Sequence, residues 1–177
     1  STLLKTIFGL IKPRQGSILL SGKEITQAEP EEKVGMGISY IPQGRNIFPS
    51  LTVKENLEMG GTPLRHSKTI EKAIQNIFQK YPILDNRKEM KAGFLSGGEK
   101  QLLALAMGMM VEPKLMLLDE PSLGLAPKVI EEIYGRINTI NHEKVTFVIV
   151  EQNARKALRL AHRAYVLDLG VNRLEDT

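Results

Sequence analysis

The 177-residue sequence contains no cysteine, and it has no apolar stretch that approaches the length of a membrane span. The first absence excludes a disulfide framework, and the second means that a role at a membrane would require a partner. Basic residues occur as pairs or spaced singles, and the formal net charge is only +4. Without a basic run, nucleic acid is not expected as a partner.

What the sequence does contain is an ordinary globular composition, with 42% hydrophobic and 25% charged residues. The continuous apolar runs 115–118 and 145–150 predict strands that are buried on both faces, as in a parallel sheet. Apolar residues at helical spacing separate them. This alternation predicts an α/β fold with a mostly parallel sheet flanked by helices.

The remaining elements are expected as short strands and helices around these runs. Further strands are predicted over 16–22, 37–43 and 164–167, and helices over 127–141 and 154–160. From 52 to about 94 the pattern is helical, with an amphipathic stripe and no convincing strand. This stretch predicts a helical subdomain inserted into a sheet protein.

Both ends of the chain look unusual for a complete domain. Ser1 is followed directly by a helical pattern that ends near Gly9, and the last residues follow a strand without a closing helix. We therefore expect both ends to be cuts through a larger domain.

Asp119 and Glu120 directly follow the apolar run 115–118. The carboxyl end of a parallel strand is where open α/β sheets bind ligands. Held there, one acid can organise a hydrated Mg²⁺ while its neighbour activates water. Taken alone, the pair fits an exposed turn equally well.

Ser96, Gly97 and Gly98 stand at the start of an apolar helix that is predicted to run through Met110. A serine and two glycines there expose a hydroxyl and backbone N–H groups that can bind an anion, aided by the helix dipole. Alone, the triplet also fits an ordinary helix cap. Ser1-Thr2 is likewise only a cap by itself, although a phosphate-binding loop ends in such hydroxyl residues.

Together these segments resemble the ATP-binding cassette (ABC) ATPases. Leu95–Gln101 (LSGGEKQ) is similar to the signature motif, and Leu115–Glu120 (LMLLDE) is similar to a Walker B strand with its catalytic glutamate. Gln43 in YIPQG matches the Q-loop glutamine, and Ser1 matches the last position of Walker A. The resemblance spans essentially the whole chain.

The resemblance implies a site and a domain layout. It assigns catalysis to Glu120 and Gln152, a metal site to Ser1, Gln43 and Asp119, and nucleotide binding to Ser1, Thr2, Gln43, Ser96, Gly97, Gly98 and Gln101. It also implies a RecA-like core over 1–43 and 111–177, with a helical subdomain over about 44–110.

The same resemblance implies ATP and Mg²⁺ as cofactors and ATP hydrolysis coupled to transport. The expected partners are a second cassette bound head to tail, transmembrane permease subunits and, indirectly, a solute-binding protein. The expected location is the cytoplasmic face of the cell membrane. Because the glycines and lysine of the phosphate loop are missing, we expect residues 1–177 alone to bind ATP poorly and not to hydrolyse it.

Finer features resemble the smaller ATPase subunit of branched-chain amino-acid importers. They are Leu57–Gly61, Pro121–Pro127 and Val150–Asn153. The alternatives are a cassette of a urea, amide or other importer, a cassette with a role outside transport, and a catalytically silent module.

Two positions depart from the usual cassette pattern. Gln152 stands where a switch histidine is common, and glutamine can donate a hydrogen bond but cannot carry a proton's charge. Leu125 stands near the place of the usual D-loop aspartate. Contacts between subunits at that loop are therefore not predicted.

Overall fold

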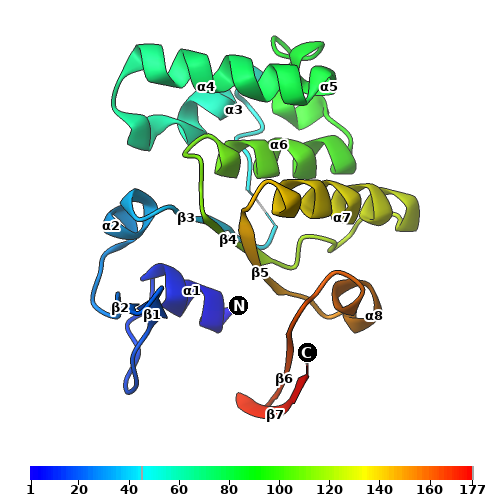
Figure 1. Ribbon diagram of the computed structural model, residues 1–177. Helices are drawn as coiled ribbons and strands as arrows, with labels where there is room; N and C mark the ends of the chain where they lie inside the picture. The colour runs from blue at the N-terminus through cyan, green and yellow to red at the C-terminus, as the bar shows by residue number, and fades with distance from the viewer. Residues whose placement is uncertain (45, 177) are drawn as a thin grey trace.

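The computed structural model describes residues 1–44 and 46–176 and, for Lys156, the backbone alone (Figure 1). The helices are α1 (Thr2–Phe8), α2 (Pro30–Gly35), α3 (Val53–Gly60), α4 (Ser67–Lys80), α5 (Pro82–Asp85), α6 (Gly97–Met109), α7 (Pro127–His142) and α8 (Ala154–Leu158), with 3₁₀ turns η1 (Thr62–Leu64) and η2 (Ala92–Phe94). The strands are β1 (Leu19–Leu20), β2 (Lys23–Glu24), β3 (Ile38–Ile41), β4 (Leu115–Asp119), β5 (Thr146–Val150), β6 (Ala164–Asp168) and β7 (Val171–Asp176).

The central element is a three-stranded parallel sheet in the order β3-β4-β5. The middle strand, β4, is the most buried, and Met116, Leu117 and Leu118 are fully enclosed. Because all three strands run in the same direction, their carboxyl ends meet at one edge. The predicted α/β class with a mostly parallel sheet and flanking helices is confirmed.

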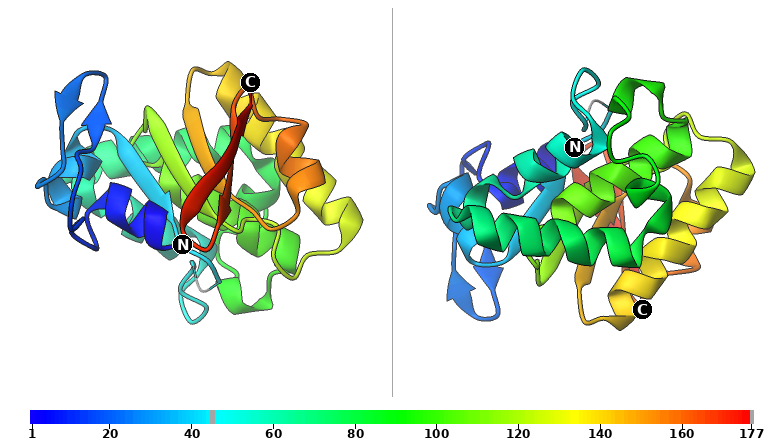
Figure 2. Two further views of the ribbon diagram at one scale, coloured as in Figure 1. Left: turned by 90° about the horizontal axis from the view of Figure 1, so that it is seen from below. Right: turned by 90° about the horizontal axis from the view of Figure 1, so that it is seen from above.

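Successive side chains of β4 point to opposite faces of the sheet, and each face has its own cover. Met116 and Leu118 pack with α6 and α7, whereas Leu117 packs with Leu4 of α1. In Figure 1, α6 and α7 accordingly lie above the sheet and α1 lies below it. Seen from above, the helical layer covers the strands (Figure 2, right).

The helices α3 to α6 enclose a separate apolar cluster, which includes Leu57, Ile77, Leu84 and Leu103. Helix α6 takes part in both layers, because Leu105 on another side of it packs with the sheet cluster. This separate cluster supports the proposed helical subdomain over 44–110 beside a core of 1–43 and 111–177. No helix in the described ranges is both long and apolar enough to cross a bilayer.

The strands predicted within 16–22 and 164–167 are present as β1 and β6, but both lie outside the three-stranded parallel sheet. β1 pairs antiparallel with β2 through a turn at Ser21-Gly22, where both φ angles are positive. β6 pairs antiparallel with β7. This hairpin lies on the α1 side of the sheet (Figures 1 and 2). Strand partners depend on turn geometry and long-range packing, which an apolar run does not encode.

The prediction that 145–150 is a strand buried on both faces was also wrong. β5 is at the edge of the described three-stranded sheet, with Thr146 exposed and the other residues only half-buried. Its composition, Thr-Phe-Val-Ile-Val, favours a strand on either an edge or an interior position.

A buried lysine joins α2 to the C-terminal end of α1. The side chain of Lys33 is enclosed, and its Nζ donates a hydrogen bond of 2.7 Å to the carbonyl of Ile7. Burial lowers the pKa of Lys33 from its usual value. Helix α1 is capped at its C-terminal end by Gly9, whose φ is 95°. A Cβ on Gly9 would lie 3.3 Å from Lys33 Nζ. The glycine therefore leaves room for the lysine at the helix end.

Lys33→Met is expected to lower the free energy of unfolding by about 2 kcal/mol, because it leaves the carbonyl of half-buried Ile7 without its donor. Urea denaturation of the full-length protein measures this change. The control is Lys128→Met on the exposed face of α7, which should change stability by less than about 0.5 kcal/mol. Equal effects of the two substitutions would contradict a specific role for Lys33.

Candidate functional site

Glu120 takes an unusual backbone conformation directly after β4. Its φ is +50°, in the left-handed region that residues with side chains rarely adopt, and its N–H donates to the carbonyl of Val150 at 2.9 Å. Such a conformation persists only where the surroundings hold it, and it occurs often at functional sites. The turn is therefore tied to the end of β5.

The carboxylate of Glu120 accepts hydrogen bonds from two glutamine amides. Gln43 Nε2 lies 2.8 Å from Oε2, and Gln152 Nε2 lies 2.7 Å from Oε1. One glutamine follows β3 and the other follows β5, so the strands on both sides of β4 contribute a donor. The three side chains that the sequence assigned to catalysis and to the Q-loop thus meet at one sheet edge.

Asp119 is the last residue of β4 and directly precedes Glu120. Its side chain is 2% exposed, and its Oδ2 accepts from the hydroxyl of Tyr40 at 3.2 Å. The amino nitrogen of Ser1 contacts the same oxygen. Burial, reinforced by the charge of Asp119, raises the pKa of Tyr40 to about 12, so its hydroxyl stays a donor at neutral pH.

Ser1 also caps α1, since its Oγ accepts from the N–H of Leu4 at 3.5 Å. Thr2 is the first residue of that helix and is exposed; its carbonyl accepts from the hydroxyl of Thr6 at 2.9 Å. The predicted metal residues Ser1 and Asp119 touch through the backbone nitrogen of Ser1, and the Ser1 hydroxyl faces the N–H of Leu4. Gln43 joins them through Glu120, the neighbour of Asp119.

The serine-glycine turn forms a second group at the start of α6. Ser96 is the N-cap, and it shares a reciprocal capping box with Glu99: the carboxylate accepts from the Ser96 backbone N–H at 2.9 Å and from its hydroxyl at 2.8 Å. Arg87 forms an ion pair with Glu99 at 3.0 Å. Partial burial raises the pKa of Glu99, but the Ser96 hydrogen bonds and Arg87 outweigh it and lower the value.

Two glycines of this turn allow a close packing contact. A Cβ on Gly97 would lie 3.1 Å from Leu125 Cδ2, and one on Gly98 would lie 2.6 Å from Val129 Cγ1. The segment after β4 thus packs directly against the turn. Ser96 and Gly97 nevertheless remain exposed, so their outward side is accessible to another molecule.

The two groups are not joined directly. In residues 1–44 and 46–176, no hydrogen bond or ion pair links the group of Ser1, Asp119 and Glu120 to the turn at Ser96. Gln101, one turn further along α6, accepts a 3.4 Å hydrogen bond from Asn46 Nδ2. It therefore contacts the loop that follows Gln43.

Comparison with known proteins identifies the family. The model of the ABC transporter family matches residues 1–123. This chain belongs to that family. It is 43% identical over its whole length to a high-affinity branched-chain amino acid transport ATP-binding protein, BraG, of Pseudomonas aeruginosa, and it covers 76% of that protein. It is 39% identical to a probable branched-chain amino acid transport ATP-binding protein, LivF, of Archaeoglobus fulgidus, with 96% of this chain and 72% of that protein covered.

Solved structures of ATP-binding cassettes have the same fold. A nucleotide-free cassette from an ABC transporter superposes with a TM-score of 0.87 at 28% identity, covering 98% of this chain and 74% of that one. The cassette cbiO1 of Clostridium perfringens gives a TM-score of 0.86 at 25% identity, covering 98% and 70%. The fold class inferred from the sequence therefore agrees with that of known cassettes.

The oxygen atoms that this ABC cassette gathers at the sheet edge suit a magnesium ion. Ser1 offers a hydroxyl and Asp119 a carboxylate. Gln43 offers its amide oxygen, because its amide N–H donates a hydrogen bond to Glu120. Mg²⁺ prefers oxygen donors and takes few from the protein when phosphates and water supply the rest. Within the described ranges no cluster of three or more His, Cys, Asp or Glu residues forms a metal site.

Sequence reasoning missed two residues of the cassette. Tyr40 reaches Asp119, and Glu151 Oε1 accepts from the backbone N–H of buried Ser122 at 3.0 Å, holding the loop after Glu120 to the end of β5. Glu151 had a usable signal, because it is an acid placed directly after an apolar run, as Asp119 is. Tyr40 had a weaker one, its position on a short strand that leads to Gln43.

Proposed function

We propose that this cassette hydrolyses ATP to drive the import of branched-chain amino acids, as one of two cassettes that clasp nucleotide between them. The observation that supports the catalytic part most strongly is the pair of amides on Glu120. A carboxylate held by donors from both neighbouring strands is fixed in direction, as a general base must be.

Glu120 accepts the proton of the water that attacks the terminal phosphoryl group. Each carboxylate oxygen has two lone pairs, so the amides of Gln43 and Gln152 leave one on each oxygen for water. Gln152 donates without titrating between pH 5 and 8, in contrast to a histidine. Ser1, Thr2 and Gln43 bind the nucleotide.

Ser1, Gln43 and Asp119 would hold the Mg²⁺ of the nucleotide complex. When bound, the ion neutralises charge on the β- and γ-phosphate oxygens. Asp119 is suited to this role because it is negatively charged, nearly enclosed and held by Tyr40. These residues then place the phosphates in front of Glu120.

Ser96, Gly97 and Gly98 bind the γ-phosphate of the nucleotide held by the second cassette, with Gln101 near that contact. The exposure of Ser96 and Gly97 supports this arrangement, as does the absence of any hydrogen bond or ion pair between the turn and Glu120 in residues 1–44 and 46–176. Backbone N–H groups at the start of α6 and the dipole of that 13-residue helix favour an anion there. ATP then joins two protomers, and hydrolysis releases them.

The transported solute is assigned through the two relatives. Both are described as branched-chain amino acid transport ATP-binding proteins, and they match this chain over 96–100% of its length. The proposed partners are permease subunits in the membrane and, through them, a solute-binding protein. With these partners we propose that the cassette works on the cytoplasmic face of the membrane, where it does not contact the solute.

We expect leucine, isoleucine or valine with its binding protein to raise the ATPase rate of the reconstituted transporter about tenfold. The measurement is phosphate release from proteoliposomes that contain the full-length protein and its permease. Urea and short amides serve as controls, because they are the solutes of the rival importer class. Stimulation by urea alone would contradict the branched-chain assignment and favour that alternative.

A further inference from the structure

We propose that Tyr40 is a positioning residue for Asp119: its hydroxyl fixes the carboxylate that holds the nucleotide's Mg²⁺. The inference rests on the metal role proposed above for Asp119. The observation behind it is the hydrogen bond from the Tyr40 hydroxyl to Asp119 Oδ2, 3.2 Å long, between adjacent strands.

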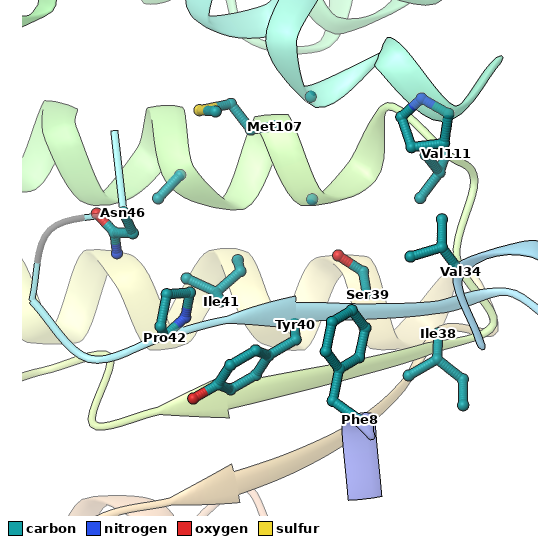
Figure 3. Close-up of a pocket in the computed structure, with 14 residues that line it drawn as sticks. Phe8, Val34, Ile38, Ser39, Tyr40, Ile41, Pro42, Asn46, Met107 and Val111 are labelled. Carbon is teal, nitrogen blue, oxygen red and sulfur yellow. The ribbon is translucent and has the colours of Figure 1, made fainter. Parts of the chain in front are cut away.

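The register of the sheet explains why these two residues meet. Tyr40 of β3 is paired with Leu117 of β4, and Asp119 follows two residues later. Side chains two apart on a strand share a face, so Leu117 and Asp119 both point toward α1. Figure 3 shows Tyr40 on the same side of β3, opposite Ser39 and Ile41, which face a pocket of about 200 Å³ next to α6.

The ring of Tyr40 is itself held in place. Its centroid lies 5.4 Å from that of Phe8 in α1, with the planes tilted by 38° (Figure 3). A tyrosine has only two side-chain torsions, so the Phe8 contact and the hydrogen bond to Asp119 together hold the ring and its hydroxyl.

The contact orients the carboxylate for a metal. The side-chain hydrogen bond that Asp119 accepts from Tyr40 is made to Oδ2. Holding that oxygen stops rotation of the carboxylate and leaves Oδ1 to face a hydrated ion. Hydrogen bonds of this kind to metal ligands commonly contribute tenfold to a hundredfold in metal affinity.

A purely structural role for Tyr40 makes a different prediction. If Tyr40 only fills space between β3 and α1, its ring matters and its hydroxyl does not. Tyr40→Phe removes the hydroxyl and keeps the ring, so it separates the two roles. Tyr81→Phe is the matched control, because the Tyr81 hydroxyl is buried and makes no hydrogen bond within the described residues.

The test is the dissociation constant for Mn²⁺, used in place of Mg²⁺ and measured by electron paramagnetic resonance on the full-length protein with a non-hydrolysable ATP analogue. Tyr40→Phe is expected to raise this constant about tenfold. Tyr81→Phe should leave it unchanged. The thermal midpoint of Tyr40→Phe should stay close to that of the wild type, because the ring and its packing remain.

Asp119→Asn separates failure of this inference from failure of the proposed function. If Asp119→Asn weakens Mn²⁺ binding but Tyr40→Phe does not, the positioning role of Tyr40 is overturned and the metal role of Asp119 stands. If Asp119→Asn leaves Mn²⁺ binding unchanged, the metal role itself is wrong. Equal weakening of Mn²⁺ binding by Tyr40→Phe and Tyr81→Phe would also overturn the inference, because the effect would then not depend on the contact with Asp119.

Discussion

Glu120→Gln is expected to lower ATP turnover by about a thousandfold, within the range that general bases contribute, while ATP binding is retained. The amide of glutamine cannot accept the proton of water, yet it occupies the same volume at the end of β4. Steady-state phosphate release and nucleotide titration of the full-length protein measure the two quantities. Because bound ATP is no longer consumed, the variant should also accumulate as an ATP-bound dimer in size-exclusion chromatography.

The matched control is Glu131→Gln, the same chemical change on an exposed position of α7. Its turnover should lie within about twofold of the wild type, as is usual for surface substitutions away from a site. Near-normal hydrolysis by Glu120→Gln would remove Glu120 from the base role. The two amides on its carboxylate would then need another explanation.

Gly97→Asp is expected to abolish ATP-dependent dimer formation and to lower turnover by about a hundredfold. The new carboxylate would stand at the start of α6, where the partner's γ-phosphate is proposed to bind, and like charges repel there. The added Cβ would also press on Leu125, 3.1 Å away. Because an acid at a helix N-terminus is favourable, the monomer itself should remain folded.

Gly135→Asp is the control for Gly97→Asp. Gly135 is exposed on α7, and a Cβ there would meet nothing within 4 Å. This variant should dimerise with ATP as the wild type does. If Gly97→Asp still forms ATP-dependent dimers in the Glu120→Gln background, as seen by size-exclusion chromatography, the proposal that the serine-glycine turn binds the partner's nucleotide is wrong.

The resemblance to ABC cassettes assigned Gln43, Glu120 and Gln152 to one site, and the structure brings their side chains together at the carboxyl edge of the parallel sheet. What the sequence did not reveal is that β4 lies between the other two strands, so that Glu120 accepts from both sides. Strand order depends on long-range packing. The catalytic, metal and nucleotide roles of these residues stay predictions.

Contacts that depend on register or on close packing could not be predicted. The pairing of Tyr40 with Leu117, which brings its hydroxyl to Asp119, becomes known only when the sheet is aligned. The approach of Leu125 to Gly97 likewise joins segments far apart in sequence. It also gives Leu125, noted as a departure from the usual aspartate, a local packing role.

The most direct measurement of the central claim is photocleavage of the full-length protein trapped with ADP, Mg²⁺ and vanadate, which takes the place of the γ-phosphoryl group. We predict backbone breaks near Ser1 and also at Ser96–Gly98, the second lost in Gly97→Asp. Breaks near Ser1 alone would contradict a nucleotide enclosed between the acids of one protomer and the serine-glycine turn of another.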